Sequence, residues 1–347
     1  MVSPEAPYPV AGGGPTRTAS IVEFLAGRFQ VHLVTFGVGP GSFTQKPAPE
    51  GVVARLDWVR LPEHGRGFLE RAIRNSSRLV RGVLPLMDRF GNSQCREQVA
   101  QRVAGRRYEL AVLEHFWTAA HVGAARRHAG RVVLDLHNVE SALHERCARS
   151  ESWATGMLHR AFARVAAREE RRWLPQFDLV LTASEEDRRR VRGATPEARV
   201  AVYPNAIPLR FPAEVEEEHV VAFSGNLEYH PNQSAVRYFA RDVWPALRQQ
   251  DSRLRWRLIG KNEWAVRRWT SGDERIEATG AVEDALRELA RARVVVVPLL
   301  AGSGTRVKIL EAWAARRAVV STRAGAEGLP AVDGENLLLA DRPGEMV

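Results

Sequence analysis

A glycine-rich segment at residues 301–305, AGSGT, stands between an apolar strand pattern and a helix pattern. The preceding residues 294–297 are four valines, which is typical of a buried parallel strand. Residues 308–315 carry helix-forming side chains. A loop of this kind leaves unpaired backbone N–H groups at a helix N-terminus, where the helix dipole also favours negative charge. The segment therefore predicts an anion site.

Charged residues next to this loop extend the prediction to a nucleotide. Arg306 and Lys308 place positive charge within one turn of the loop, and Glu311 adds a carboxylate one turn further on. A carboxylate there can accept hydrogen bonds from a diol, so the pattern fits a phosphate beside a ribose. The alternative is an ordinary doubly wound α/β unit with a solvated first helical turn. The chain has only three lysines, which favours a role for Lys308.

Residues 302–329, GSGTRVKILEAWAARRAVVSTRAGAEGL, resemble the donor-site segment of group 1 (family four) glycosyltransferases, which have the GT-B fold. Members of that family carry two glutamates eight positions apart, and the second holds the ribose of the nucleotide. Glu311 matches the second glutamate. Ser303 occupies the position of the first, as in the GGGTR-type branch of polysaccharide-biosynthesis transferases.

The resemblance implies a second donor loop at residues 225–232, after an apolar strand pattern. In many family members this loop carries an arginine and a lysine that hold the diphosphate, but here these positions fall on Asn226 and Pro231. We therefore expect Arg306 and Lys308 to hold the diphosphate instead. The donor-binding residues implied by the resemblance are Gly225, Asn226, Gly280 and Val282 (both near the base), Ser303, Gly304, Thr305 and Glu311.

A histidine follows another apolar strand pattern, at residues 131–136. Ligands of α/β sheets bind at the carboxyl ends of the strands, although a histidine there is more often an ordinary loop residue. The run DLHNVE, residues 135–140, resembles a segment of the same family, in which the histidine faces the donor sugar near its anomeric carbon. The resemblance implies this role for His137, with Lys308 and Arg306 as the other catalytic groups.

The N-terminal stretch contains three consecutive glycines, Gly12, Gly13 and Gly14, followed by Arg17. The resemblance implies that this loop and the arginine lie on the acceptor side, whereas a plain turn is the simpler alternative. The GxGxxG spacing of a dinucleotide site is absent. Only two or three residues before the glycines can serve as a first strand, so we expect the natural chain to begin further upstream.

Composition and charge are those of an ordinary globular protein. The 347 residues are 45% hydrophobic and 26% charged, which suits two domains. The net charge of +9 favours anionic partners, but the arginines are scattered and form no nucleic-acid-binding tract. Cys95 and Cys147 lie far apart in the sequence, which predicts no disulfide framework and fits a cytoplasmic protein. The chain has no CxxC motif and no DxD motif, so we expect no bound metal.

Residues 69–90 interleave arginines with apolar side chains in a helical pattern. Such a helix fits either peripheral contact with an anionic membrane, at the inner face of the cell membrane, or packing on the protein's own core. We favour packing, with Gly82 and Pro85 ending the helix. No apolar run approaches the length of a membrane span.

Strand and helix patterns alternate along the chain and predict an α/β protein of two Rossmann-like parallel-sheet domains facing a cleft, the GT-B arrangement. The expected domains are residues 1–205, on the acceptor side, and 206–347, which bind the nucleotide-sugar. The resemblance leads us to expect that the C-terminal helices of the family are missing from this chain. The acidic run 214–218 is predicted to be a solvated linker. The predicted strands are residues 31–36, 110–113, 131–136, 179–183, 200–203, 220–224, 256–259, 276–279, 294–297 and 318–321, with helices at 21–29, 158–173 and 308–315.

The resemblance implies a retaining glycosyltransferase that moves a sugar from a nucleotide-sugar donor to a saccharide or lipid-linked acceptor, in cell-surface polysaccharide or glycolipid biosynthesis. No metal cofactor and no nucleic-acid partner are expected. One alternative is a catalytically inactive sugar-nucleotide-binding subunit, favoured by Ser303 and by the missing arginine and lysine. The other is a GT-B sugar-nucleotide epimerase, which requires carboxylates flanking the hexose.

Overall fold

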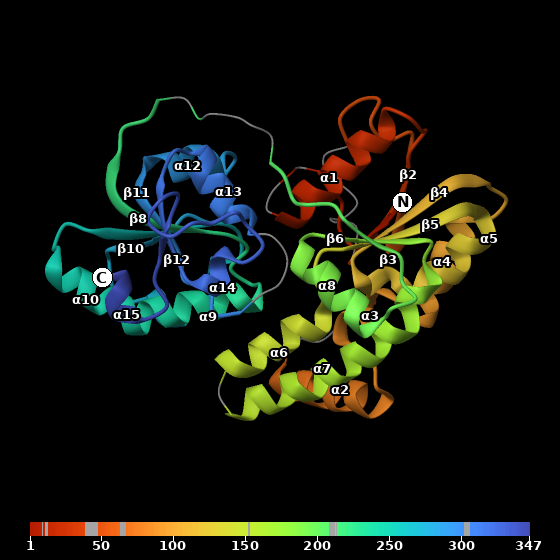
Figure 1. The fold of residues 1–347 in the computed structure, drawn as a ribbon, viewed down its shortest axis with the longest axis horizontal. Coiled ribbons are helices and arrows are strands. Elements are labelled where there is room, and N and C mark those ends of the chain that lie inside the picture. Colours follow the sequence, from red (N-terminus) through yellow and green to blue (C-terminus); the bar gives the residue numbers. More distant parts are fainter. Residues whose placement is uncertain are drawn as a thin grey trace. The chain divides into compact units, whose positions relative to one another are not determined.

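The computed structural model divides the chain into two compact units. The first unit is Met1–Ala148 with Ala154–Pro204, and the second is Arg149–Trp153 with Asn205–Val347 (Figure 1). For residues 68, 69, 71, 72 and 150 only the backbone is described. The structure describes residues 1–8, 10, 13–38, 48–62, 67–151, 153–207, 212, 214–301 and 306–347.

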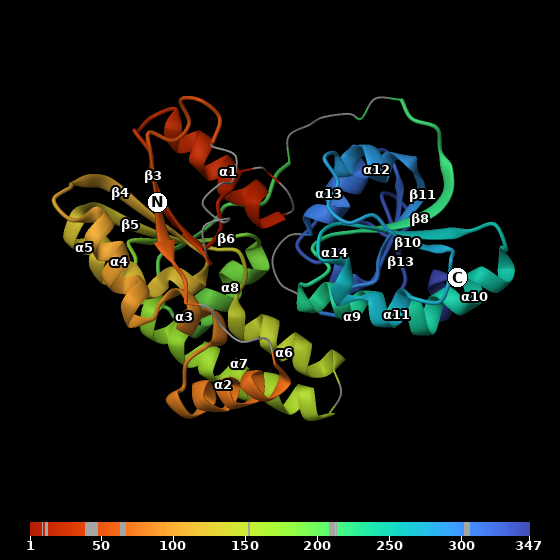
Figure 2. The ribbon, with the colours of Figure 1, turned by 180° about the vertical axis from the view of Figure 1, so that it is seen from behind.

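Each unit is built on one parallel sheet, which confirms the predicted α/β fold with two Rossmann-like sheets. The first sheet has seven strands in the order β3-β2-β1-β4-β5-β6-β7, and the second has six in the order β10-β9-β8-β11-β12-β13. Both orders start from a central strand and reverse direction there, as in dinucleotide-binding folds. In the second unit α12 and α13 cover one face of the sheet, and α9, α10 and α15 cover the other (Figures 1 and 2).

In the first unit the strands are β1 (Val2–Ser3), β2 (His32–Gly37), β3 (Arg55–Arg60), β4 (Tyr108–Glu114), β5 (Ala129–Leu136), β6 (Leu179–Thr182) and β7 (Val200–Val202). The helices are α1 (Gly13–Ala26), α2 (Phe68–Arg81), α3 (Pro85–Phe90), α4 (Ser93–Val103), α5 (Val122–His128), α6 (Glu140–Ser150), α7 (Trp153–Trp173) and α8 (Glu185–Ala194), with 3₁₀ turns at Phe116–His121 and Leu174–Gln176.

In the second unit the strands are β8 (Glu218–Ser224), β9 (Arg255–Ile259), β10 (Ile276–Ala278), β11 (Ala292–Val297), β12 (Ala318–Ser321) and β13 (Leu338–Leu339). The helices are α9 (His230–Tyr238), α10 (Trp244–Gln250), α11 (Arg267–Thr270), α12 (Ala285–Arg291), α13 (Val307–Ala314), α14 (Arg323–Ala326) and α15 (Pro343–Met346), with a π-helical turn at Phe239–Val243 and a 3₁₀ turn at Glu263–Ala265.

The predicted strands all exist, with ends shifted by at most two residues, and the structure adds β3 beside the short strands β1 and β13. The central strand β1 is short, but Val2 pairs with Val34 on one side and with Leu113 on the other. β3 escaped prediction because it is an edge strand whose side chains are mostly exposed, so it lacks the apolar run of a buried parallel strand.

Two local predictions need correction. Gly13 and Gly14 do not form a loop but the first turn of α1. Glu218 is not a solvated linker residue: it begins β8 and accepts hydrogen bonds from Arg255 (2.8 Å) and Arg257 (2.6 Å) of β9. These bonds, that of Arg257 first, lower the pKa of Glu218. The acidic side chain therefore helps to hold neighbouring parallel strands in register.

Helix α2 packs on the protein's own core, as we favoured. Its Arg78 is buried and donates to Asp88 Oδ2 at 2.9 Å, and Gly82 ends the helix in the left-handed conformation. Ile73 and Val80 remain exposed on its outer side. Among the described residues, none of the helices combines the length and the apolar character that crossing a membrane requires.

A close backbone approach gives a test of the second unit. Gly260, after β9, has φ +144°, and a Cβ there would lie 2.0 Å from the carbonyl oxygen of Gly225. We expect Gly260→Ala to lower the free energy of unfolding of this unit by about 3 kcal/mol, because both the clash and the backbone conformation are unfavourable. Gly344→Ala is the control, since a Cβ there meets nothing within 4 Å. Urea unfolding measures both, and equal midpoints would contradict the expected strain.

Candidate functional site

The strand order of the second sheet reverses between β8 and β11, and open α/β sheets bind ligands at such a switch point. β8 ends at Ser224 and β11 at Val297, and α13, which follows β11, begins at Val307. The hydroxyl of Ser224 is buried there with no hydrogen-bond partner among the described residues. This edge carries the residues predicted to bind a nucleotide.

Lys308 lies over the end of β8. Its Nζ donates to Asn232 Oδ1 at 2.7 Å and lies 4.5 Å from the ring centroid of Phe223. Gly225 leaves room for this contact, because a Cβ there would lie 3.2 Å from Nζ and 2.8 Å from Asn232 Nδ2. An amide and an aromatic ring hold the ammonium without neutralising it, so its charge remains available to a ligand.

Glu311 lies one turn further along α13 and is half-buried. Among the described residues its carboxylate has no hydrogen-bond partner. Burial raises the pKa of Glu311 to about 7, although Lys308 acts in the opposite direction. Burial, followed by the charge of Arg306, lowers the pKa of Lys308 to about 7, although the charge of Glu311 acts in the opposite direction. Both groups thus titrate near neutral pH and respond to any bound charge.

Arg306 is tied to its own unit. Its guanidinium donates to the carbonyl oxygen of Ala324 at 3.4 Å (Nε) and 3.2 Å (Nη2), and Nη2 lies 3.8 Å from Glu327 Oε2. The side chain is buried. The structure therefore gives Arg306 a part in holding α14, besides the expected contribution of its charge.

The remaining donor residues surround the ends of β8, β9 and β10. Asn226 Oδ1 accepts from the backbone N–H of Glu228 and from Asn262 Nδ2, both at 3.0 Å, so its side chain closes the loop. The N–H of Gly260 donates to Gly280, which has φ +69°. Val282 packs against the core. Ser303, Gly304 and Thr305 lie outside the described residues.

The switch point of the first sheet, between β1 and β4, has a cluster of buried charges beside it. Arg17 of α1 makes two hydrogen bonds to Asp135 of β5, Nε–Oδ2 at 2.6 Å and Nη2–Oδ1 at 2.5 Å. Nη1 of Arg17 donates to the carbonyl oxygen of Tyr203 at 2.6 Å. Both partners of the ion pair are almost fully buried, so the pair ties α1 to β5 and to the end of β7.

His137 follows β5 and meets two carboxylates. Its Nε2 lies 2.6 Å from Glu114 Oε2 and 3.3 Å from Asp135 Oδ2. Burial acts to lower the pKa of His137, but the hydrogen bonds to Asp135 and Glu114 outweigh it and raise this pKa to about 9. Burial raises the pKa of Glu114, whereas bonds from His137 and Arg17 lower that of Asp135 despite its burial. The imidazole is therefore protonated at neutral pH.

A stack of rings supports His137. The His115 ring lies on it with centroids 3.5 Å apart, and the Trp117 ring lies 4.2 Å beyond. Trp117 Nε1 donates to Glu140 Oε1 at 2.8 Å. Burial, followed by the charges of His137 and Arg17, holds the pKa of His115 well below its usual value, so this ring is neutral.

Sequence reasoning selected Arg17 and His137 but missed Glu114 and His115. Both missed residues follow the predicted strand 110–113, at the edge of the sheet where ligands bind. Their position after this strand could therefore have identified them as candidate site residues. Gly13 and Gly14 lie in the first turn of α1, and Gly12 lies outside the described residues.

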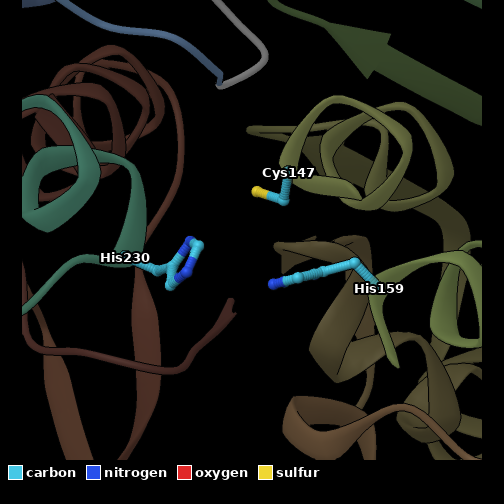
Figure 3. A group of neighbouring side chains, drawn as sticks. All are labelled: Cys147, His159 and His230. Carbon is cyan, nitrogen blue, oxygen red and sulfur yellow. The ribbon is translucent and has the colours of Figure 1, made fainter. Parts of the chain in front are cut away.

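Among the described residues of the first unit, Glu114, Asp135 and His137 have the side-chain types of metal ligands. The positive charge of Arg17 already pairs with Asp135. Figure 3 shows Cys147 of α6, His159 of α7, and His230, which begins α9 of the second unit. Within the first unit, His159 Nδ1 lies 2.9 Å from His144 Nδ1, so one ring donates to the other.

The comparisons with known proteins agree with this architecture. Residues 218–347 match the family model "Glycosyl transferases group 1". The structure is similar to Anabaena Alr3699/HepE in complex with UDP-glucose, with 15% identity, a TM-score of 0.64, and 99% of this chain and 85% of that chain covered. It is also similar to a UDP-forming trehalose-phosphate synthase from Burkholderia vietnamiensis, with 13% identity, a TM-score of 0.60, and 99% and 89% covered.

These likenesses show the fold: two Rossmann-like domains of the GT-B type. Comparison with curated protein sequences gave no match.

The buried ion pair predicts a stability effect. We expect Asp135→Asn to lower the free energy of unfolding of the first unit by about 3–5 kcal/mol, because it leaves the Arg17 guanidinium buried and uncompensated. Glu185→Gln is the control: its partner Arg188 is solvent-accessible, so the unfolding midpoint should barely move. Chemical denaturation followed by tryptophan fluorescence measures both. A small effect of Asp135→Asn would mean that another group compensates Arg17.

Proposed function

We propose that the chain is a glycosyltransferase that transfers a sugar with retention from a nucleotide-sugar donor to a saccharide or lipid-linked acceptor. The match of residues 218–347 to the family model "Glycosyl transferases group 1" supports this proposal. The observation that carries the proposal is the pair Lys308 and Glu311 on α13, at the switch point of the second sheet. An ammonium held by a neutral amide suits a diphosphate. A carboxylate one turn away, without a hydrogen-bond partner among the residues that the structure describes, suits a ribose diol.

The base is proposed to lie near Gly280 and Val282, beyond the ends of β9 and β10. HepE was solved with UDP and glucose and with UDP-glucose, and the trehalose-phosphate synthase is UDP-forming. UDP-glucose is therefore the first donor to test, with GDP- and ADP-glucose beside it.

We assign the contact with the donor sugar to His137, whose position in the sequence matches the family histidine. In the proposed reaction the bond between the anomeric carbon and the diphosphate oxygen breaks, and a bond from the acceptor oxygen to that carbon forms on the same face. The acceptor proton passes to the leaving diphosphate, whose charge Lys308 stabilises. Glu114 and Asp135 are bound to His137 and Arg17, which argues against either as a nucleophile.

The two pKa values near 7 predict how donor binding depends on pH. An anionic diphosphate binds protonated Lys308, so affinity falls as the pH rises above about 7. The ribose diol prefers ionised Glu311, so affinity also falls as the pH drops below about 7. Calorimetric titration of UDP-glucose from pH 5.5 to 8.5 should therefore show tightest binding near neutrality, and UDP-glucose avoids the titration of a terminal phosphate.

Glu311→Gln should weaken the binding of UDP-glucose about tenfold or more at pH 7, because a hydrogen bond to a charged acceptor is lost. It should also remove the fall in affinity below about pH 7. Glu335→Gln, an exposed site on the same unit, is the matched control. An unchanged affinity in Glu311→Gln would contradict the ribose assignment. A flat pH profile would contradict the role of Lys308.

A second test separates the three candidate functions. The protein is incubated with the donor it binds and with saccharide or lipid-linked acceptors, with and without EDTA, and products are followed by NMR. We expect a new glycosidic bond of the same anomeric configuration as the donor, at a rate that EDTA does not change. Binding without any product would favour the inactive subunit, and an altered sugar on an intact nucleotide would favour the epimerase.

A further inference from the structure

Glu114 is a member of the buried cluster whose role in the reaction no resemblance supplies. Its side chain is fully buried at the end of β4. Oε2 accepts from His137 at 2.6 Å and from the hydroxyl of Thr18 at 3.1 Å. Oε1 has no hydrogen-bond partner among the described residues. A buried carboxylate in this state needs a cation close by.

That cation is His137. The other positive group of the cluster, Arg17, directs Nε and Nη2 to Asp135 and Nη1 to the carbonyl oxygen of Tyr203. His137 lies within hydrogen-bond distance of Glu114, whereas Arg17 acts on Glu114 through its charge. Loss of the imidazolium proton would leave Glu114 buried with an uncompensated charge, which is strongly unfavourable.

The ring stack fixes the orientation of the imidazole. His115, which directly follows Glu114, stacks on His137, and Trp117 stacks on His115. Glu140 anchors Trp117 at the far end. Stacking on His115 restricts rotation of the His137 ring, so the Nε2–H of His137 stays aimed at Glu114. Glu114 and His115, at the end of β4, thus control His137, Glu114 by its charge and His115 by its packing.

The charged and titratable groups that face His137 come from each element around it. Glu114 and His115 come from the end of β4, Asp135 from β5 and Arg17 from α1. His115 is neutral, and Arg17 and Asp135 balance each other. The hydrogen bonds to Asp135 and to Glu114 both raise the pKa of His137. Because Asp135 also pairs with Arg17, Glu114 is the carboxylate whose charge His137 alone meets at hydrogen-bond distance.

We infer that Glu114 is a positioning residue that keeps the His137 imidazole protonated and aimed, so that His137 acts as a fixed cation in sugar transfer and not as a general base. The inference rests on the proposed function, in which His137 contacts the donor sugar. An imidazolium of this kind cannot accept the acceptor proton, which leaves the diphosphate oxygen as the proton acceptor. It can donate a hydrogen bond to the donor and attract its negative charge.

The experiment reads the charge of His137 directly. ¹⁵N-histidine-labelled protein is titrated by NMR between pH 5 and 10 without any ligand, and His137 is assigned by its loss in His137→Asn. We expect a midpoint for wild type about 2 units above that of a free histidine. Glu114→Gln keeps the size of the side chain but removes its charge, and should lower the midpoint by about 1–3 units. Glu114→Asp keeps the charge and should retain most of the elevation.

Glu170→Gln is the matched control. Glu170 is another buried glutamate of the first unit, but its partner is Ser141, so its loss should leave the midpoint of His137 unchanged. A wild-type midpoint below 7 would overturn the inference, even if Glu114→Gln fails to fold. An unchanged midpoint in a folded Glu114→Gln protein would overturn it as well.

This test is independent of donor binding. A protein that fails to bind nucleotide-sugars but shows the raised midpoint would refute the proposed function and leave the pairing of Glu114 with His137 intact. A protein that binds UDP-glucose but carries a neutral His137 would refute the inference alone. With UDP-glucose as the probe, a loss of rate in Glu114→Gln with unchanged KM would add support.

Discussion

Parallel strands must be buried on both faces, and this constraint determines where the chain can keep reactive groups. The strands of both sheets consist largely of valine, leucine, isoleucine and alanine, because helices cover them on either side. Polar side chains are displaced to the strand ends. At the carboxyl ends, where the strand order reverses, neighbouring helices diverge and leave space for a ligand. Glu114, His137, Ser224 and Lys308 all lie at such ends.

The two units treat buried charge in different ways. In the first, Arg17, Asp135, Glu114 and His137 form a network in which each charge faces an opposite one. Its geometry is set before any ligand arrives, and such preorganised charge is what stabilises a transition state at low cost. In the second, Lys308 faces a neutral amide, and within the described part of the chain its ammonium makes no ion pair. That unit is arranged to gain favourable interactions only when an anion binds.

Pairing also explains why Arg17 and Arg306, which the sequence offers as cations for ligands, are less available than Lys308. Arg17 holds α1 against β5, and Arg306 holds α14 through the carbonyl oxygen of Ala324. A guanidinium with several donors readily becomes a structural cross-link, whereas a lysine ammonium that meets one amide keeps donors free. The abundance of arginine in this chain therefore overstates its capacity to bind anions.

The amino-acid sequence by itself determined the alternation of strands and helices, the two parallel sheets and the loops that carry Lys308, Glu311 and His137. These features depend on periodicity and on residues within one turn of each other, so local patterns are enough. It did not indicate β3, whose exposed side chains lack an apolar run. Only the tertiary structure decided which charges meet. Arg17 reaches Asp135 across more than a hundred residues, and Glu114 reaches His137 because β4 and β5 are adjacent in the sheet. Strand order and register create these pairs, and neither is written in the local sequence.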